Sequence, residues 1–542
     1  MEYNLADLWE AVVDAVPENE ALVCGDRRLT FAQADERATR LAHVLAEHGV
    51  GAGDHVALYL YNGTEYLEAM LAAFKIRAVP INVNYRYVED ELRYLFDNAD
   101  TKAVVFHREF VPKLAAIRAD LPQLQTYVAV DDGSTDDLTA LDALDYEAAV
   151  GTASSDLDFG PRSADDLYIL YTGGTTGMPK GVMWRHEDIF FGAFGGGGLG
   201  NPISKPAEIA DRARAGASRA LPACPFMHGT AHWMAFLTLF EGGAVVIDSE
   251  RSLDPVHVWE LVARERVTFL VIVGDAMGRP LVEAIERLDT SVDLSNLVML
   301  LSGGAILSPA VKRQLAAHLP STLVIDGIGS SEAGGQGQML ATKDGEIPAQ
   351  PRFAMSPDNT VLDDDLKPAG VGVVGKLARS GRIPIGYYKD PEKSAATFPE
   401  VDGVRWSIPG DAARIEDDGT ITVLGRGSVS INTGGEKVYP EEVEGALKGH
   451  AAVFDAVVVG IPDQRWGERV VAVVQPRGTE QPTLDDLETH LRHHLAGYKL
   501  PRDLVLVDTI VRSPSGKPDY RWAKQTAIEH LPPHDPSRVP AP

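Results

Sequence analysis

Tyr171-Thr172-Gly173-Gly174-Thr175-Thr176-Gly177-Met178-Pro179-Lys180-Gly181 is the stretch around which the rest of the chain is organised. It follows an apolar run, residues 167–171, that predicts a buried strand, and a second apolar run comes directly after it. Its glycines let successive backbone N–H groups converge on an anion, while the threonine hydroxyls and Lys180 add donors and positive charge. We interpret the stretch as a nucleotide-phosphate loop.

Two other interpretations of this loop were weighed. An ordinary glycine-rich hairpin turn needs neither three hydroxyls nor a lysine. A Walker A loop needs Gly-Lys-Ser/Thr, whereas here Pro179 precedes Lys180 and Gly181 follows it. The pattern therefore favours an ATP site of another class.

Composition and charge exclude several classes of protein. The chain has 542 residues, 45% hydrophobic and 24% charged, which is typical of a globular protein with several structural units. A net charge of −28 argues against nucleic-acid and anionic-membrane surfaces. No signal pattern or membrane-spanning run is found, and two distant cysteines, Cys24 and Cys224, fit a reducing compartment. We expect a cytoplasmic protein without integral membrane segments.

The order of the apolar runs predicts an α/β fold. Strands and helices alternate over residues 55–107 and again over 165–335, which predicts two sheets built from βαβ units. Residues 352–424 predict a small β subdomain. We place the domain boundary so that residues 1–425 form a large N-terminal domain and residues 426–542 a small α+β domain. Two further segments are expected at the surface, an acidic one at 131–162 and a glycine-rich one at 192–200 that is either a lid or a flexible loop.

Candidate site residues follow the ends of predicted strands. Gly303-Gly304 and the segment Gly329 to Glu332 both do so, and ligands bind at this edge of open α/β sheets. The Glu332 carboxylate fits a Mg²⁺ ligand near a triphosphate, and Asp411 fits an acceptor for ribose hydroxyls. Lys517 lies between Gly516 and Pro518 in a predicted loop. Taken singly, each of these three residues also fits an ordinary surface position.

Together these motifs resemble, in content and order, the adenylate-forming superfamily of acyl-CoA synthetases, luciferases and peptide-synthetase adenylation domains. The resemblance covers nearly the whole chain. It is carried by Tyr171–Gly181, Met227-His228-Gly229, Gly303-Gly304-Ala305, Gly329-Ser330-Ser331-Glu332, Gly410-Asp411, Gly425-Arg426, Gly434 to Glu444 and Gly516-Lys517. Residues 184–188, 425–432 and 517–522 look closest to the actinobacterial branch that activates steroid side-chain acids and long-chain fatty acids.

The resemblance implies a two-step reaction and a role for each matching residue. A carboxylate attacks the α-phosphate of MgATP to give acyl-AMP and pyrophosphate; the C-terminal domain then rotates, and coenzyme A displaces AMP. Lys517 is implied to bridge the attacking carboxylate and the α-phosphate, and His228 to lie at the mouth of the acyl pocket. The implied contacts to ATP come from Thr172, Gly173, Gly174, Thr175, Thr176, Gly177, Lys180, Gly303, Gly304, Ala305, Ile328, Gly329, Ser330, Ser331, Asp411 and Arg426; those to Mg²⁺ from Thr172 and Glu332; those to coenzyme A from Gly434 and Gly435.

Two positions depart from the family pattern. Ile328 stands where the family usually has an aromatic residue stacked on adenine, so an aliphatic platform is expected. Ser428 stands at the hinge, where Asp or Lys is common. Gly427 beside it permits a large change of backbone angles, so we still expect rotation.

We expect an acid–CoA ligase acting on a large hydrophobic carboxylic acid, either a steroid side-chain acid or a long-chain fatty acid. Trp233 and Met234 predict apolar pocket walls, and Gly334 and Gly335 leave space. Three alternatives stay open to different degrees: an amino-acid adenylation domain, which would need an aspartate at His228; a ligase that loads an acyl carrier protein; and a non-catalytic acyl- or nucleotide-binding protein. The sequence leaves a homodimer open.

Overall fold

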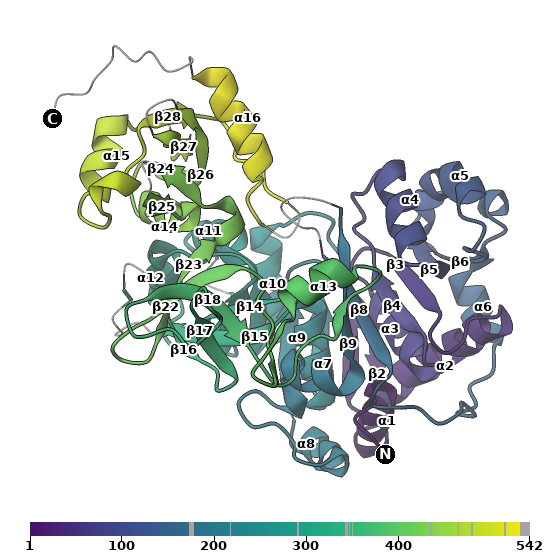
Figure 1. Ribbon diagram of the computed structural model, residues 1–542. Helices are drawn as coiled ribbons and strands as arrows, with labels where there is room; N and C mark the ends of the chain where they lie inside the picture. The colour runs from purple at the N-terminus through teal and green to yellow at the C-terminus, as the bar shows by residue number, and fades with distance from the viewer. Residues whose placement is uncertain are drawn as a thin grey trace.

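Two large sheets and a small C-terminal sheet make up the fold of the computed structural model (Figure 1). The structure describes residues 1–172, 178–216, 218–289, 292–341, 345, 347–348, 351–433, 436–463, 466–478, 481–513 and 516–531, without the side chains of Arg426 and Ser428. Several predicted site residues lie outside this description: Gly173, Gly174, Thr175, Thr176, Gly177, Gly434, Gly435 and the side chains of Arg426 and Ser428.

The first sheet has eight strands and carries the predicted phosphate loop. Its central strands are parallel, and their residues are nearly all buried, as expected of strands covered on both faces. In spatial order the strands are β19 (Gly386–Tyr387), β9 (Lys180–Arg185), β8 (Leu167–Thr172), β4 (Val79–Asn82), β3 (His55–Tyr59), β5 (Thr101–His107), β6 (Thr126–Val130) and β7 (Leu144–Asp145).

The second sheet has thirteen strands, and its parallel half bears the other site motifs. The order is β17 (Asn359–Leu362), β18 (Val374–Arg379), β22 (Asp411–Ile415), β23 (Ile421–Arg426), β16 (Arg352–Met355), β15 (Gly334–Ala341), β14 (Leu323–Ser330), β13 (Met299–Gly303), β12 (Phe269–Ile272), β10 (Arg219–Pro222), β11 (Ala244–Ile247), β1 (Glu20–Cys24) and β2 (Arg27–Thr30). The predicted β subdomain therefore continues this sheet on its antiparallel side. A short separate pair, β20 (Glu400–Val401) and β21 (Val404–Arg405), lies beyond it.

Helices cover the two large sheets, and several begin where the sequence predicts. Thr30 caps α2 in a capping box with Gln33. The helices of this part are α1 (Leu5–Ala15), α2 (Phe31–Glu47), α3 (Thr64–Lys75), α4 (Glu89–Asn98), α5 (Val111–Ile117), α6 (Tyr146–Thr152), α7 (His186–Gly192), α8 (Ile209–Ala215), α9 (Gly229–Phe240), α10 (Pro255–Arg264), α11 (Gly274–Ile285), α12 (Pro309–His318) and α13 (Pro391–Thr397).

The C-terminal part folds around a sheet of its own. The order is β25 (Glu436–Val438), β24 (Ile431–Thr433), β27 (Gly467–Pro476) and β26 (Val453–Asp463), and β28 (Asp503–Leu506) pairs with β27. The helices α14 (Pro440–Leu447), α15 (Leu484–Leu491) and α16 (Tyr520–His530) pack on it. In Figure 1 this part, yellow to green, lies against α11 and β23.

Sheet membership differs from the prediction in two places. The hairpin β1–β2 joins the second sheet through a parallel pairing with β11, although it precedes the first sheet in sequence. Conversely β8 and β9 belong to the first sheet, so the second sheet does not begin at residue 165. Both pairings join segments far apart in the chain, which apolar periodicity does not specify.

Two segments predicted at the surface are more ordered than expected. Within residues 131–162, α6 places Tyr146 in the core, where its hydroxyl donates to Glu68 at 2.6 Å. In the glycine-rich segment, residues 195–197 form a 3₁₀ turn against α9, and a Cβ at Gly195 would lie only 2.9 Å from Leu237 Cδ1. Residues 195–197 are thus packed against α9, whereas Leu199 is exposed.

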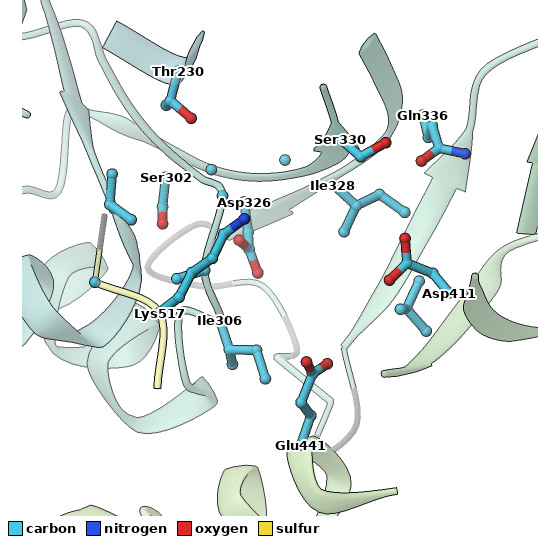
Figure 2. A pocket seen from close by; sticks show the side chains of 18 of the residues that line it. Thr230, Ser302, Ile306, Asp326, Ile328, Ser330, Gln336, Asp411, Glu441 and Lys517 are labelled. Carbon is cyan, nitrogen blue, oxygen red and sulfur yellow. The ribbon is translucent and has the colours of Figure 1, made fainter. Parts of the chain in front are cut away.

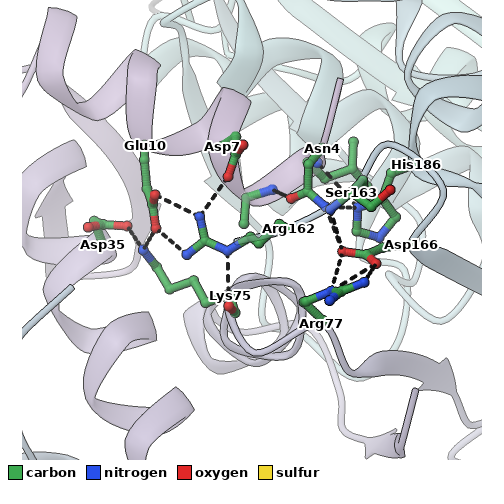
Figure 3. Close-up of polar contacts among 12 residues, drawn as sticks. Asn4, Asp7, Glu10, Asp35, Lys75, Arg77, Arg162, Ser163, Asp166 and His186 are labelled. Carbon is green, nitrogen blue, oxygen red and sulfur yellow. Dashed lines mark hydrogen bonds and ion pairs between the residues drawn. The ribbon is translucent and has the colours of Figure 1, made fainter. Parts of the chain in front are cut away.

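A buried polar network ties the N-terminal helices to the segment before β8 (Figure 3). Lys75 is fully buried, and its ammonium lies 2.7 Å from Glu10 and 2.8 Å from Asp35. Arg162 bridges Glu10 to Asp7, so three segments meet at these charges. Buried charges are tolerated when paired in this way.

Across the described residues, no helix combines the length and the apolar character needed to cross a membrane.

Candidate functional site

A cavity of about 1430 Å³ lies between the two large sheets and the C-terminal part. Figure 2 shows Lys517 entering it from the C-terminal part and pointing toward the side where Ser302 and Asp326 lie, with Asp411 and Glu441 farther across. Of the predicted site residues, the structure brings the following to its walls: Thr172, His228, Gly303, Gly304, Ala305, Ile328, Gly329, Ser330, Ser331, Glu332, Asp411 and Lys517.

Hydrogen bonds connect Lys517 with the described residues before it. Ser513 N–H donates to the Lys517 carbonyl at 2.8 Å, Gly516 N–H donates to the Ser513 carbonyl at 2.8 Å, and a bridge joins Arg512 to Pro518. Gly516 has φ +72°, which only glycine adopts readily, and a Cβ there would lie 3.2 Å from Ala276 Cβ. The sequence places glycine here because the turn approaches α11 closely.

The nucleotide side of the cavity lies at the carboxyl ends of β13 and β14. Gly303 ends β13, and Ile328 lies on β14 opposite Gly337. In Figure 2, Ile328 stands between Asp326 and Asp411 and presents an aliphatic side chain at the cavity wall. Asp411, the first residue of β22, pairs with Arg426 of β23 in the antiparallel register. These two strands bring the residues predicted to bind the ribose side by side.

The turn that carries Glu332 is held from three sides. Trp184 Nε1 donates to the Ser331 carbonyl at 3.0 Å, and Ser407 Oγ donates to the Glu332 carbonyl at 2.6 Å. Buried Arg379 donates to the carbonyl of Gly335 at 3.1 Å and also to that of Ala333. The prediction treated this segment as a loop, but β14 extends through Ser330, so only the residues around Glu332 turn.

Glu332 has a side-chain partner that the sequence gave no reason to expect. The Tyr387 hydroxyl donates to Glu332 Oε1 at 2.9 Å, and both side chains are buried, at 6% and 9% exposure. Thr172 lies on the same cavity at the end of β8. A carboxylate and a hydroxyl facing a space for phosphates fit Mg²⁺, which usually takes few protein oxygens and completes its shell with phosphates and water. Among the described residues, no larger cluster of potential metal ligands is found.

Lys180 departs from its predicted position. It does not line the cavity within the described part of the chain; its ammonium lies 2.5 Å from Asp390 Oδ2 and 5.8 Å from the ring centroid of Tyr387. It faces Thr172 across the β8–β9 pair, so the predicted phosphate loop connects two antiparallel strands. The hairpin geometry and the proposed phosphate contacts are therefore compatible.

His228 is held neutral at the cavity wall. Its Nε2 atom is buried and makes no hydrogen bond to the described residues. Burial, followed by the nearby charge of Lys517, lowers the pKa of His228 to about 3. A neutral imidazole with an unsatisfied nitrogen suits hydrogen bonding to a bound ligand better than it suits a fixed charge.

Asp326 is a further charged residue of the cavity that the prediction missed as a site residue. It is buried on β14, and its carboxylate lies 2.6 Å from the ammonium of Lys312, which is fully buried. Burial outweighs this partner and raises the pKa of Asp326 to about 6. The only signal in the sequence was an aspartate at the end of an apolar run, and its partner lies on the helix α12.

Apolar side chains also line the cavity. Trp233 and Met234, on α9, contribute as predicted, together with Phe191 of α7 and Leu199 from the glycine-rich segment. Trp233 Nε1 donates to the hydroxyl of buried Tyr168 at 2.9 Å, which fixes the indole. The lining thus combines polar residues, here called the polar half, with apolar residues, here called the apolar half.

Comparisons with known proteins agree with this geometry. The family model "AMP-binding enzyme" matches residues 9–388, and "AMP-binding enzyme C-terminal domain" matches residues 442–517. The chain is 50% identical to the 3-oxocholest-4-en-26-oate–CoA ligase of Rhodococcus rhodochrous, with 97% of each chain covered. It is 47% identical to the medium/long-chain-fatty-acid–CoA/3-oxocholest-4-en-26-oate–CoA ligase of Mycolicibacterium smegmatis, with 98% of this chain and 97% of the relative covered.

Solved structures share the fold over nearly the whole length. ATP-bound MatB from Rhodopseudomonas palustris superposes with a TM-score of 0.82 at 26% identity, covering 97% of this chain and 99% of that one. The anthranilate–CoA ligase AuaEII in complex with anthranoyl-AMP gives a TM-score of 0.84 at 22% identity, covering 98% of both chains, and shows likeness of fold. On its sequence, its fold and both matched family models, the chain belongs to the AMP-binding enzymes of the adenylate-forming superfamily.

Proposed function

We propose that the protein is an ATP-dependent acid–CoA ligase that activates a large hydrophobic carboxylic acid as its acyl-adenylate and transfers the acyl group to coenzyme A. The observation that carries this proposal is the position of Lys517, which enters a cavity whose polar half holds the nucleotide motifs and whose apolar half suits an acyl chain. Relatives with 47–50% identity over nearly their full lengths are named as ligases of this kind.

The polar half supplies what adenylation requires. Transfer of a nucleotidyl group depends mainly on positioning and on neutralising charge that develops at phosphorus. The Lys517 ammonium would neutralise charge between the attacking carboxylate and the α-phosphate. Asp411 would accept hydrogen bonds from the ribose hydroxyls, with Arg426 beside it, and Ile328 would pack against adenine.

Mg²⁺, where it binds, would be held by Glu332 and Thr172 and would offset the negative charge of the phosphates. Tyr387 keeps the Glu332 carboxylate oriented toward the cavity. Lys180 would reach the β- and γ-phosphates only by leaving Asp390, so we assign it to phosphate binding as a contact formed with the nucleotide.

The apolar half supports a bulky acid. A volume of about 1430 Å³ for the whole cavity exceeds the roughly 300–1,000 Å³ of common small-molecule sites, which leaves room for a large acyl group beside ATP. The relatives from Rhodococcus and Mycolicibacterium are both named for a steroid acid, and the latter also for medium- and long-chain fatty acids. We therefore propose both acid classes as substrates.

We further propose that residues 426–542 move as a mobile domain on a hinge at Ser428, and that Gly434 and Gly435 approach the pantetheine arm after this movement. Both cysteines, Cys24 and Cys224, are free thiols, which supports action in the reducing cytoplasm.

A panel of carboxylic acids with pyrophosphate release as the readout tests the proposal. We expect release to depend on ATP and on 3-oxocholest-4-en-26-oate or a fatty acid such as dodecanoate, and a thioester to form when coenzyme A is added. If the adenylate forms with these acids but the acyl group is transferred only to an acyl carrier protein, that protein and not coenzyme A is the acceptor. Absence of pyrophosphate release with every acid would refute the ligase assignment.

The role of Lys517 has its own test in the two half-reactions. We expect Lys517→Ala to abolish adenylate formation while thioester formation from supplied acyl-AMP survives. Equal loss in both half-reactions would contradict the assigned role.

A further inference from the structure

We propose that Arg512 and Asp455 are positioning residues for adenylation: the Asp455–Arg512 pair holds the turn that presents Lys517 to the cavity. This inference rests on the proposed role of Lys517 in forming the acyl-adenylate. Neither residue is among the nucleotide or metal contacts assigned above, and Asp455 does not line the cavity within the described residues.

Arg512 connects a rigid strand to the Lys517 turn through its whole guanidinium. Nε and Nη2 donate to the two carboxylate oxygens of Asp455, each at 2.7 Å. Nη1 donates to the carbonyl of Gly516 at 2.8 Å, one residue before Lys517. The planar fork can make these three bonds at once, which fixes the Gly516 carbonyl relative to Asp455.

Asp455 is itself anchored. It lies on β26, whose pairing with β27 runs along most of both strands, and its side chain and that of Arg512 are each 14% exposed. One of its oxygens also accepts the N–H of Ala456 at 2.9 Å, and the ammonium of buried Lys448 lies 3.5 Å away. Although burial opposes ionisation, the charges of Lys448 and Arg512 lower the pKa of Asp455 to about 2. The pair therefore stays ionised at any pH at which the protein works.

The same turn is docked on the N-terminal part. Gly516 approaches Val273 and Ala276 at the start of α11 so closely that a Cβ would lie 3.3 Å from Val273 Cγ1. Next to Asp455 in the chain, Phe454 lies under the guanidinium of Arg279 of α11, 5.6 Å from Cζ to the ring centroid. The anchor of the lysine turn and its docking surface thus adjoin, and the Arg512 bond to Gly516 joins them.

Only the adenylation half-reaction should depend on this arrangement. Misplacing a catalytic group by about 1 Å can lower a rate roughly 100-fold. Removing Arg512 frees the Gly516 carbonyl and so the position of Lys517, while the N-terminal nucleotide and acyl contacts remain. We therefore expect the turnover of adenylation to fall with little change in the KM of ATP or of the acid.

The experiment uses the full chain and whichever of dodecanoate and 3-oxocholest-4-en-26-oate gives faster pyrophosphate release. Adenylation is followed by pyrophosphate release without coenzyme A, and thioester formation is followed from the matching acyl-AMP. The variants are Arg512→Ala, Arg512→Lys and Asp455→Asn. The matched control is Arg469→Ala, which breaks another largely buried Arg–Asp pair in the C-terminal part, 3.0 Å from Asp503.

We expect Arg512→Ala to lower kcat of adenylation roughly 10- to 100-fold, with each KM within about twofold and the thioester half-reaction within about twofold. Arg512→Lys should recover part of the loss, because an ammonium can reach Asp455 or Gly516 but cannot form the fork. The kcat of adenylation for Asp455→Asn should lie between the values for Arg512→Lys and Arg512→Ala. Arg469→Ala should leave the kcat of adenylation near that of the unaltered chain, even if it lowers the thermal unfolding temperature as much as Arg512→Ala does.

The proposal is overturned if Arg512→Ala lowers both half-reactions equally, or if Arg469→Ala loses as much adenylation as Arg512→Ala does. If Arg512→Ala does not fold, Arg512→Lys and Asp455→Asn carry the same comparison. Lys517→Ala separates the two proposals. If adenylation survives this change, the role of Lys517 itself is refuted. If Lys517→Ala abolishes adenylation while Arg512→Ala keeps full activity, only the positioning role is refuted.

Discussion

Tyr387→Phe gives the most direct test of the metal side of the site. The change removes one atom, the hydroxyl that donates to Glu332 Oε1 at 2.9 Å, and keeps the ring. The contact between Lys180 and that ring, at 5.8 Å, is therefore retained. The two side chains are 6% and 9% exposed, so little water is at hand to replace the lost donor.

The magnitude follows from the kind of bond removed. A hydrogen bond to a charged group contributes about 1.5–3 kcal/mol, which corresponds to roughly 10- to 150-fold in an equilibrium constant. Losing a partner that orients a metal ligand usually costs roughly 10- to 100-fold in metal affinity or activity. We expect the apparent affinity for Mg²⁺ in adenylation to weaken about 10- to 100-fold, with the KM of the acid unchanged.

The assay titrates Mg²⁺ at fixed ATP and follows pyrophosphate release. Tyr388→Phe is the matched control, because it removes the same atom from the neighbouring residue, whose hydroxyl donates to Asp100 at 2.7 Å outside the cavity. That variant should change the Mg²⁺ dependence less than about twofold, as is common for exposed pairs. An unchanged Mg²⁺ dependence in Tyr387→Phe, together with a strong effect of Glu332→Gln, would refute the orienting role.

Three further predictions concern the adenine platform, the buried cluster and the buried histidines. Ile328→Tyr should lower the KM of ATP about fivefold, because base–aromatic stacking contributes roughly 1–3 kcal/mol; an unchanged or raised KM would contradict the platform. Lys75→Met leaves buried Asp35 without its cation and Glu10 with Arg162 alone, and should lower the free energy of unfolding by about 3–5 kcal/mol, measured by urea denaturation; a loss below about 1 kcal/mol would contradict the pairing. Burial lowers the pKa values of His186 and His232 to about 4 in the folded chain. In the unfolded chain the same histidines bind protons near pH 6.5. Stability should therefore fall as the pH drops from about 6.5 to 4, by about 2 kcal/mol per histidine at pH 5, and His232→Gln should flatten this dependence in urea titrations.

Local patterns in the sequence predicted most of the elements. The capping box at Thr30, the proline that opens the helix at Pro440 and the apolar runs of the strands are signals carried within a few residues. Several helices were not predicted. Among them is α11, in which Gly274 and Pro280 are residues that usually end helices. It nevertheless provides the surface on which the Lys517 turn docks.

The sequence predicted only those site residues that stand in recognisable motifs. Glu332, Asp411 and Lys517 stand in short sequence patterns, and the structure brings all three to one cavity. Tyr387 and Arg512 act through partners 55 and 57 residues away, so no local pattern connects them to the site. Asp326 and its partner Lys312 stand on different elements, β14 and α12, so no pattern within one element connects them.

The contacts between the lysine turn and α11 bear on the second half-reaction as well as on the first. Lys517 occupies the cavity only while the Gly516 turn rests on α11, so the arrangement described here suits adenylation. Coenzyme A chemistry by the proposed rotation would require that contact to open. A cation–π contact such as Arg279–Phe454 contributes roughly 0.5–2 kcal/mol, which biases a two-state equilibrium without locking it. The Asp455–Arg512 pair lies wholly within the C-terminal part and would move with the turn. The proposed rotation would therefore carry the lysine turn and its Asp455–Arg512 anchor away from α11 together.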